Sequence, residues 1–470
     1  MESVRHVQYS TGAGQSLVEI PTPQSKLPLW PHQEEAFRFA FPKEAVLCAM
    51  DMGTGKSAVA VALLNTHDLA PVLILCPKSV VPVWPKEFAK HSAHPYRVLA
   101  YPDNWSVARK AQDAARWLAI AGRTVLVLNY EACWREPMAK LLGGVGWGAI
   151  VCDESHRIKS HNGKASRYLG RLRTRARYRY CLTGTPLPHS PLDAFGQFRF
   201  LDPRVFGTSV TRFRNRYAEM GGYGGYEVKR WIRQDEFNAR FYSLTTRCLA
   251  EDVLDLPDYG HTERICFLEP KAARLYRELE ALFYAEVEAG TVTVSNALTK
   301  LLRLQQLTSG YLPLDDGTLQ QVSTAKAKLL RDVLENDIPP EEPVVIFCRF
   351  RSDLDTVQAV GEALGRPVAE LSGRARQLAE WQAGEYTLLA AQLQAGGVGV
   401  DLTRSHYQIY YSLGYSLGDY EQSLKRVHRP GQEHAVSYIT LTAQGTVDEK
   451  VRDALARRKS VIDAILEERS

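Results

Sequence analysis

The stretch that decides the fold reads Met50-Asp51-Met52-Gly53-Thr54-Gly55-Lys56-Ser57, and it follows the apolar run 46–49. Its glycines let the backbone curl so that successive N–H groups point at phosphate oxygens, and the helix that it opens reinforces the attraction for anions. The pattern predicts that Lys56 reaches the β- and γ-phosphates of ATP and that Ser57 ligates Mg²⁺. Met50 stands where the generic pattern has glycine, so the match is to a shortened form, and a turn that binds no nucleotide is the alternative.

A second stretch carries acidic residues directly after an apolar run, Ile150-Val151-Cys152-Asp153-Glu154-Ser155-His156. Ligands of parallel sheets bind at the carboxyl ends of the strands, where these acids would lie. We expect Asp153 to hold Mg²⁺ and Glu154 to orient and deprotonate the attacking water. Taken alone the pair could equally cap a helix. Its position, about 97 residues after Lys56 with two or three strands between, favours a catalytic pair within one lobe.

Short apolar runs alternate with amphipathic segments twice along the chain, which is typical of parallel sheets covered by helices. Strands are expected at 72–76, 124–128, 149–152 and 180–182, and again at 344–348, 388–391, 409–411 and 437–441. Helices are expected at 57–65, 108–121 and 272–288, with a closing helix at 446–468. The predicted fold class is α/β, with two tandem parallel-sheet lobes and a helical insertion and linker between them. The expected boundaries are an N-terminal extension 1–28, lobe one 29–203, the insertion 204–323 and lobe two 324–470.

Composition narrows the class of protein without identifying it. The 470 residues include 58 Lys and Arg against 53 Asp and Glu, a mild basic excess that is compatible with nucleic acid. Eight scattered cysteines show no CxxC spacing, so we expect free thiols and no zinc site. No apolar stretch of about 18 residues occurs and no secretory leader is visible, so no membrane partner is expected and the chain is interpreted as soluble and intracellular.

Further motifs place the chain beside a known family. The most specific are 394–403, Gln-Ala-Gly-Gly-Val-Gly-Val-Asp-Leu-Thr, and 422–432, Gln-Ser-Leu-Lys-Arg-Val-His-Arg-Pro-Gly-Gln. Together with Leu29-Trp30-Pro31-His32-Gln33 and Leu182-Thr183-Gly184-Thr185-Pro186, the series resembles the Swi/Snf-type ATPases of helicase superfamily 2. The resemblance runs from Trp30 to about Arg452 and implies two RecA-like lobes. Ser155 and His189 depart from the family pattern, and we expect little consequence from Ser155.

The resemblance implies a role for each matching residue. Gln33 would read the adenine edge, an assignment with a physical basis because an amide side chain can make two hydrogen bonds to adenine. Arg426 and Arg429 would act as arginine fingers, with Arg429 on the γ-phosphate. Nucleotide contacts are expected from Met52, Gly53, Thr54, Gly55, Lys56, Ser57, Gly397 and Asp401. Coupling of the ATP site to DNA is expected from His156, Thr183, Thr185 and Gln422, and backbone contacts to DNA from Lys78, Ser79, Tyr130, Arg349 and Gln394.

Three features keep two interpretations each. Trp84 is interpreted as packing rather than contacting DNA. The basic run Arg171, Arg173, Arg175, Arg177 and Arg179 could face DNA or solvent. The aromatic loop 223–231 could contact DNA, although a packed insertion is the simpler interpretation.

The implied function is an ATP- and Mg²⁺-dependent translocase that moves along double-stranded DNA through sequence-independent backbone contacts. It would remodel or displace DNA-bound structures, and other DNA-bound proteins are expected among its partners. The alternatives are a strand-separating DNA or RNA helicase, a scaffold without catalysis, and the motor subunit of a defence or restriction complex. Little sequence lies outside the motifs, which favours a compact bacterial or phage-encoded form. A cytoplasmic location in a bacterium or phage-infected cell is therefore expected, or a nuclear one in a eukaryote.

Overall fold

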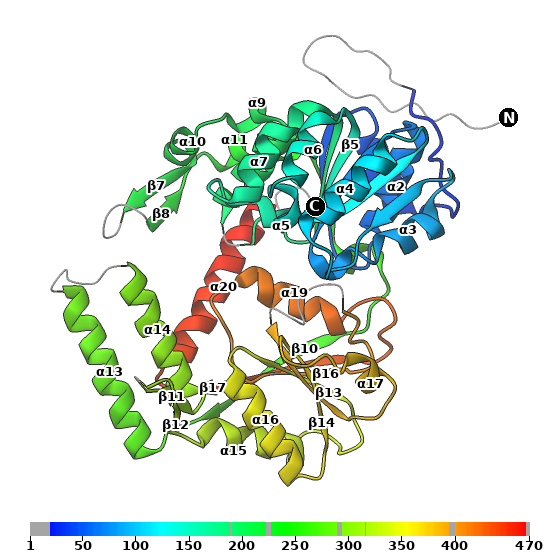
Figure 1. The fold of residues 1–470 in the computed structure, drawn as a ribbon. Helices are drawn as coiled ribbons and strands as arrows, with labels where there is room; N and C mark the ends of the chain where they lie inside the picture. The colour runs from blue at the N-terminus through cyan, green and yellow to red at the C-terminus, as the bar shows by residue number, and fades with distance from the viewer. Residues whose placement is uncertain are drawn as a thin grey trace. The chain divides into compact units, whose positions relative to one another are not determined.

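The computed structural model describes residues 19–188, 190–221, 227–288, 294–314, 316–393 and 400–466. The chain divides into two compact units, the first running through Leu254 and the second from Asp255 to Val461. Each unit is built on its own sheet (Figure 1). No helix among the described residues is long and apolar enough to cross a membrane.

The first unit contains a seven-stranded sheet in the order β3-β4-β2-β5-β6-β1-β9, with every neighbouring pair parallel. Its central strands are fully buried because helices cover both faces, and this explains their continuous apolar runs. The strands are β1 (Ala45–Met50), β2 (Val72–Cys76), β3 (Arg97–Ala100), β4 (Thr124–Asn129), β5 (Trp147–Asp153), β6 (Ala176–Thr183) and β9 (Thr245–Cys248).

Helices and short 3₁₀ turns connect these strands and position the sequence motifs at the sheet's carboxyl edge. The α-helices are α1 (Pro31–Ala40), α2 (Lys56–Thr66), α3 (Trp84–His91), α4 (Val107–Leu118), α5 (Tyr130–Cys133), α6 (Met138–Gly144), α7 (Lys164–Leu172), α8 (Ala194–Leu201), α9 (Pro203–Phe206), α10 (Val210–Tyr217), α11 (Gln234–Tyr242) and α12 (Ala250–Val253). The 3₁₀ turns are η1 (Lys78–Val80), η2 (Ser155–Ile158), η3 (Arg173–Arg175) and η4 (Pro191–Asp193). β7 (Ala218–Gly221) and β8 (Glu227–Trp231) pair antiparallel.

The second unit contains a six-stranded parallel sheet in the order β10-β17-β16-β13-β15-β14. Two apolar clusters form its core, and residues such as Ile346 and Phe347 alternate between them. The strands are β10 (Tyr259–Cys266), β13 (Val344–Cys348), β14 (Val368–Leu371), β15 (Leu388–Gln392), β16 (Tyr407–Tyr410) and β17 (Val436–Ala443). A separate pair is β11 (Tyr311–Pro313) with β12 (Leu319–Gln321).

The helices of this unit are α13 (Pro270–Glu288), α14 (Val294–Thr308), α15 (Ala325–Asn336), α16 (Arg351–Ala363), α17 (Leu378–Gln382), α19 (Leu417–Val427) and α20 (Val447–Leu466). The first turns of α20 bury Val447, Val451 and Leu455. Asp448 forms an ion pair with Lys326 at 2.6 Å and accepts a hydrogen bond from Thr308 at 2.9 Å. The closing helix that the sequence predicted is therefore fixed to α15 and α14 at its start.

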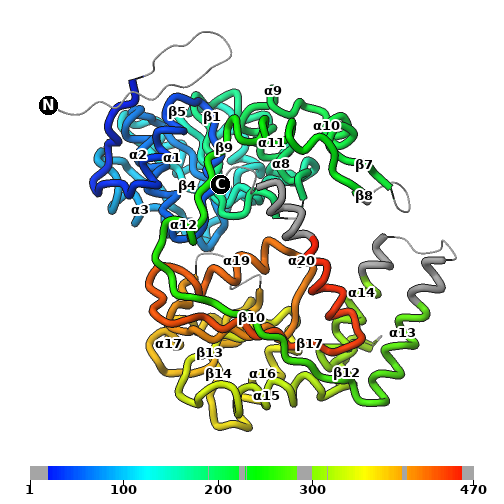
Figure 2. The backbone as a smooth tube through the Cα atoms, turned by 180° about the vertical axis from the view of Figure 1, so that it is seen from behind, coloured from blue at the N-terminus to red at the C-terminus, as the bar shows by residue number. Residues whose placement is uncertain are grey.

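The predicted fold class, two parallel-sheet α/β lobes, is confirmed. The segment 204–323, predicted as a helical insertion and linker, contributes to both units. Its first part, through Leu254, belongs to the first unit and supplies β9, while β10 belongs to the second sheet. Figure 2 traces the chain from β9 through α12 into β10. Both strands lie at sheet edges, where pairing needs backbone hydrogen bonds but no apolar run, so hydrophobic patterning did not reveal them.

Candidate nucleotide site

The phosphate loop joins the end of β1 to the start of α2 in the first unit. Gly53 and Gly55 have φ angles of 82° and 88°, a left-handed conformation that side chains other than glycine disfavour. Lys56 begins the helix, and its Nζ donates hydrogen bonds to the carbonyl oxygens of Met50 at 2.8 Å and Asp51 at 2.9 Å. The first N–H groups of a helix have no partner within the helix. The loop therefore places the N–H groups of a helix start beside an ammonium group, as an anion site requires.

Gln33 lies against this loop. Its Nε2 donates to the carbonyl oxygen of Thr54 at 3.0 Å, and its Oε1 accepts from the backbone N–H of Trp30 at 3.0 Å. A Cβ atom at Gly55 would lie 2.2 Å from Gln33 Nε2 and would displace this side chain, and the φ angle of 88° itself disfavours any other residue. The structure thus brings the entry motif of α1 into direct contact with the phosphate loop, although the two are about twenty residues apart.

The acidic motif follows β5, at the same carboxyl edge of the sheet. Asp153 Oδ1 accepts from the backbone N–H of Glu154 at 2.9 Å, and Oδ2 accepts from Trp84 Nε1 at 3.2 Å. The Tyr130 hydroxyl donates to the Asp153 carbonyl oxygen at 2.7 Å. Trp84 and Tyr130 are both buried, so each supports Asp153 from within the fold. Trp84 packs, as the sequence suggested, and the Tyr130 hydroxyl is engaged internally rather than exposed to a ligand.

Electrostatics at Asp153 point to a cation. Burial, followed by repulsion from Glu154, raises the pKa of Asp153 to about 7, while Lys56 acts in the opposite direction. Lys56 therefore compensates the buried charge only in part. A divalent cation would stabilise the ionised carboxylate, since a nearby opposite charge lowers a carboxyl pKa. Asp153 and Ser57, at the first turn of α2, are the residues that would hold Mg²⁺, and the uncompensated charge fits such an ion.

Glu154 is held in an unusual backbone conformation. Its φ angle is 51°, which is uncommon for a residue other than glycine and often marks a functional position. Its Oε2 lies 3.4 Å from His156 Nδ1, and the same nitrogen lies 3.3 Å from Thr183 Oγ1. Thr183 Oγ1 also accepts from the backbone N–H of Thr185 at 3.1 Å. A continuous polar series therefore joins the expected base to the motif after β6.

Two contacts near this series were not anticipated from the sequence. The Ser155 hydroxyl donates to Gln197 Oε1 at 2.7 Å, and Gln197 Nε2 donates to the Pro186 carbonyl oxygen at 2.6 Å. Asp51 Oδ2 accepts from the backbone N–H of Ala250 at 3.2 Å, which ties the phosphate loop to α12. Sequence alone offers no signal for either contact, because the partners lie 42 and 199 positions apart.

Lys78 and Ser79 lie in η1, directly after β2, and both are exposed. They share the carboxyl edge of the sheet with the phosphate loop and the acidic motif, because all these strands run parallel. This exposure leaves both side chains available for a backbone phosphate. Met52 and Thr54 lie within the loop itself, and the Thr54 hydroxyl donates to the Asp51 carbonyl oxygen at 2.7 Å.

In the second unit, α19 and the segment after it carry the arginines. Arg426 is 1% exposed, and Arg429 Nη1 donates weakly to the Val400 carbonyl oxygen at 3.5 Å. Arg429 Nε is buried and has no hydrogen-bond partner among the described residues. Burial alone would raise the pKa of Asp401, but hydrogen bonds from Thr403 and the charges of Arg429 and Arg426 lower it. Arg426, Arg429 and Asp401 therefore lie close enough to interact within this unit.

Gln432 anchors the arginine segment. Its Nε2 donates to the carbonyl oxygens of Ser405 at 2.8 Å, Thr403 at 3.2 Å and Val427 at 3.3 Å. Gln422 lies on α19 and is buried. Gly397 and Gln394, predicted to contact nucleotide and DNA, fall outside the described residues, as does His189.

Arg349, a predicted DNA contact, follows β13. Its backbone N–H donates to Ser412 Oγ at 2.8 Å, and its Nη1 donates to Gln305 Oε1 at 2.5 Å. Gln305 Nε2 in turn donates to the Leu413 carbonyl oxygen at 3.1 Å. Burial lowers the pKa of Arg349, which is consistent with a guanidinium that is partly enclosed between α14 and the loop after β16.

Comparison with known proteins identifies the family of these two units. The SNF2-related domain family matches residues 32–310, which is more than half of the chain. The helicase conserved C-terminal domain family matches residues 325–431. The second match includes the described arginines and Asp401, and the first includes the phosphate loop and the acidic motif.

Individual relatives are more distant. The chain is 27% identical to the chromodomain-helicase-DNA-binding protein 1-like of Mus musculus, over 89% of this chain and 47% of that protein. It is 25% identical to putative protein p41 of Acyrthosiphon pisum secondary endosymbiont phage 1, over 88% of this chain and 93% of that protein. It is 24% identical to the DNA annealing helicase and endonuclease ZRANB3 of Bos taurus, over 98% of this chain and 42% of that protein. The chain thus spans about half the length of two of these relatives.

Among solved structures, the SWI2/SNF2 ATPase core of Sulfolobus solfataricus in complex with double-stranded DNA is 23% identical. The similarity covers 95% of this chain and 94% of that chain, with a TM-score of 0.44.

Proposed function

The chain belongs to the SNF2-related family of helicase-like ATPases, and on that premise we propose that it hydrolyses ATP to move along double-stranded DNA. The observation that carries the proposal is the polar series from Glu154 through His156 to Thr183. A base that is linked through a histidine to a neighbouring motif can pass the state of the nucleotide to the rest of the lobe. Such a connection is what a motor needs and what a simple nucleotide-binding protein does not.

The chemistry proposed for the first unit is phosphoryl transfer to water. Lys56 and the backbone N–H groups of the phosphate loop bind and orient the terminal phosphates of ATP. Glu154 orients the attacking water and accepts its proton, while Mg²⁺ held by Asp153 and Ser57 neutralises phosphate charge when it is bound. Gln33 would contact the adenine of ATP, and its hydrogen bond to Thr54 would connect that contact to the phosphate loop.

Arg426 and Arg429 of the second unit are proposed to complete the site as arginine fingers. Arginine fingers stabilise the charge that develops on the transferred phosphoryl group. If these residues act only when the units close, nucleotide binding and hydrolysis would drive opposed movements of two DNA grips, meaning the DNA-contacting residues of each unit. Lys78, Ser79 and Arg349 are proposed to contribute to those grips through backbone phosphates.

Double-stranded DNA is proposed as the track. Two of the relatives carry DNA in their names, one as a helicase-DNA-binding protein and one as a DNA annealing helicase. The proposed outcome of movement is that structures or proteins bound to DNA are displaced. Affinity that depends on backbone contacts would fall steeply with salt and depend little on sequence.

The test compares ATP turnover with no nucleic acid, with single-stranded DNA, with duplex DNA and with RNA. We expect the largest stimulation from duplex DNA, and no separation of strands on a tailed duplex. Efficient strand separation would identify a helicase instead. Stimulation by RNA alone would contradict the proposed track.

A further inference from the structure

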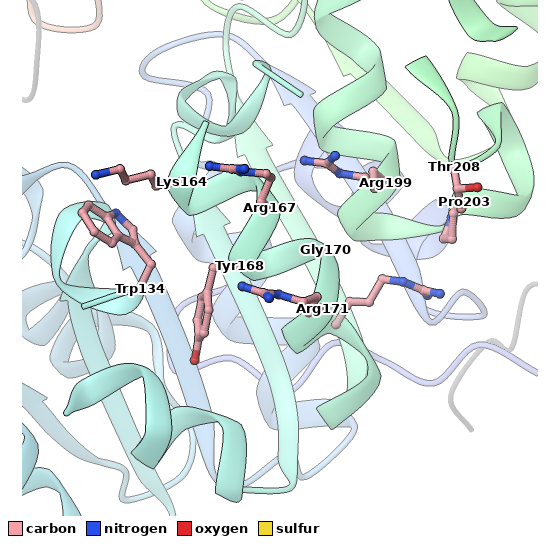
Figure 3. Close-up of a pocket in the computed structure, with 10 residues that line it drawn as sticks. Trp134, Lys164, Arg167, Tyr168, Gly170, Arg171, Arg199, Pro203 and Thr208 are labelled. Carbon is pink, nitrogen blue, oxygen red and sulfur yellow. The ribbon is translucent and has the colours of Figure 1, made fainter. Parts of the chain in front are cut away.

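A pocket of about 670 Å³ lies on the first unit, away from the phosphate loop. Helix α7 forms one side of it (Figure 3). The rest is formed by Trp134 directly after α5, Arg173 of η3, Arg199 of α8, Pro203 of α9 and Thr208 after α9. The residues that carry the argument are Trp134, Lys164, Arg167, Arg171, Arg173 and Arg199. None of the sequence motifs accounts for this pocket.

Its lining is strongly basic. Five of the residues that line it are Lys or Arg, and none is acidic. Among the described residues, Arg167, Arg171 and Arg173 form no ion pair with a carboxylate. Burial lowers the pKa of Arg199, and the charge of Arg167 lowers it further, so these two cations repel each other. A lining of this kind selects an anion that carries several charges.

One of the cations is fixed in place. Arg199 Nη2 donates to the carbonyl oxygen of His161 at 3.0 Å and to Ser166 Oγ at 2.9 Å. Its Nε is buried and has no hydrogen-bond partner among the described residues. A Cβ at Gly170 would lie 3.3 Å from that nitrogen, so the glycine on α7 makes room for the guanidinium. The Arg199 guanidinium is therefore held in position across α7 and keeps one donor unused.

The other cations follow one face of a helix. Lys164, Arg167 and Arg171 are spaced i, i+3 and i+7 on α7, so they extend over roughly 10 Å at 1.5 Å per residue. A DNA strand presents phosphates at regular short intervals, one per roughly 3.4 Å of helix axis, so a row of cations this long can contact more than one phosphate. Guanidinium groups suit phosphate oxygens because they can donate two parallel hydrogen bonds. The arrangement fits a charged chain better than a single small anion.

The residues that line the pocket are different from those of the expected DNA grip in this unit, Lys78 and Ser79. Helix α7 follows β5 and precedes β6, which run parallel, so α7 returns from the carboxyl edge of the sheet toward the amino edge. Lys164, at the start of α7, therefore lies toward the carboxyl edge, as do Lys78 and Ser79, whereas Arg171 lies toward the amino edge. The cations of the pocket all come from one unit, and their spacing does not depend on the position of the other.

We propose that this pocket binds the phosphate backbone of DNA and anchors it to the first unit in every nucleotide state. The inference rests on the proposed function, because it takes DNA as the partner. It also assigns the basic run near Arg171 to two environments. Arg171 and Arg173 line the pocket, whereas Arg175 and Arg177 are exposed outside it.

The test uses the full chain and a fluorescent duplex of about 30 base pairs, titrated between roughly 50 and 200 mM salt. The variant Arg167→Gln/Arg171→Gln removes two pocket charges, and Arg175→Gln/Arg177→Gln removes two exposed charges outside the pocket as a matched control. We expect the salt slope of the pocket variant to shrink by about 1.8 and its affinity to fall at least about tenfold at 0.1 M salt. The loss should be the same without nucleotide and with a non-hydrolysable ATP analogue.

Measurements of ATP turnover distinguish a defect in DNA binding at the pocket from a defect at the ATP site. At saturating duplex the pocket variant should keep the wild-type kcat, while the duplex concentration for half-maximal stimulation rises about tenfold. Equal losses in both double variants would overturn the inference, since general charge would then explain binding. If polyglutamate displaces duplex from the wild-type chain as readily as unlabelled duplex does, the pocket binds an acidic protein instead. If inorganic tripolyphosphate binds tightly and the salt slope for duplex does not change, the pocket binds free polyphosphate instead. Either result overturns the inference. A wild-type chain that binds no duplex contradicts the proposed function as well, whereas normal wild-type binding with an unaffected pocket variant contradicts the pocket alone.

Discussion

At the scale of single residues, several structural observations bear on Glu154. Its left-handed backbone, its buried neighbour Asp153 and its contact with His156 all follow from its place at the end of β5. A strained residue persists only where the surrounding structure holds it, and such residues cluster at functional sites. The geometry therefore supports the role of base more firmly than the two-letter Asp-Glu pattern did.

Replacing Glu154 by glutamine removes the proton acceptor and keeps the shape of the side chain. We expect ATP turnover with duplex DNA to fall by about 10² to 10⁴-fold, the usual contribution of a positioned base, while ATP binding is retained. Phosphate release and equilibrium binding of a fluorescent ATP analogue measure the two quantities. The matched control is Glu87→Gln on α3, a carboxylate outside the site, which should turn over ATP at the wild-type rate. Turnover that survives in Glu154→Gln would assign the base elsewhere.

At the scale of elements, close packing sets where the acidic motif lies. Helix α8 approaches η2 so closely that a Cβ at Gly196 would lie 2.2 Å from the Ile158 carbonyl oxygen and 2.4 Å from that of Lys159. Backbone atoms cannot move aside as a flexible side chain can. The glycine thus lets α8 fix the turn that immediately follows Glu154.

The variant Gly196→Ala should lower the free energy of unfolding by about 1 to 3 kcal/mol because it forces the two elements apart. Gly143→Ala on α6 provides the contrast, since nothing lies within 4 Å of the added carbon. That control should be neutral or stabilising by up to about 1 kcal/mol, because alanine favours helix. Urea denaturation followed by circular dichroism measures both variants. If Gly196→Ala and Gly143→Ala were equally stable, η2 could move away from α8 at little cost in free energy.

A second prediction at this scale concerns Glu269, before α13. It accepts hydrogen bonds from Ser323 Oγ at 2.6 Å and from Thr324 N–H at 3.0 Å and Oγ1 at 2.7 Å. Burial opposes ionisation, yet these donors prevail and lower the pKa of Glu269 to about 2. Because the folded pKa is depressed, the ionised group stabilises the protein above the unfolded pKa of about 4.5, and this contribution is lost as the pH falls toward 2.

Glu269→Gln should therefore lower the free energy of unfolding by about 1 kcal/mol at pH 7, a modest value because the carboxylate is partly exposed. The difference from wild type should shrink below about pH 4.5 and vanish near pH 2. Denaturant titrations over this pH range measure it. Glu278→Gln, which disrupts only the exposed pair with Arg274, should show no comparable loss. A penalty for Glu269→Gln that does not vary with pH would mean that packing, not charge, holds this junction.

At the scale of the whole molecule, the two units carry different parts of the expected chemistry. The first holds the phosphate loop and the acidic pair, and the second holds Arg426 and Arg429. Arg429 Nε, buried and without a hydrogen-bond partner among the described residues, has capacity for an anion. Dividing one reaction between two bodies would make turnover depend on their approach, as the proposed motor requires.

Arg429→Ala should reduce duplex-stimulated turnover by about 10³-fold or more, the usual effect of losing an arginine finger, while binding of the ATP analogue stays within a few-fold of wild type. Arg457→Ala, an exposed arginine on α20, is the control and should keep full turnover. Steady-state turnover and analogue titration on the same preparations distinguish the two effects. A parallel loss of binding in Arg429→Ala would instead indicate that the second unit had misfolded.

The amino-acid sequence by itself determined the strand–helix alternation of both lobes, the phosphate loop and the acidic pair. Each of these depends on neighbours in the chain: an apolar run forms a buried strand, and the glycines and acids that follow it necessarily lie at the strand's carboxyl end.

Only the tertiary structure decided which distant groups meet. It assigned the Tyr130 hydroxyl to Asp153, divided 204–323 between two units, and gathered Arg199 with the cations of α7. The physical reason is that such contacts are fixed by how helices and strands pack in three dimensions, and residue spacing along the chain carries no record of that packing.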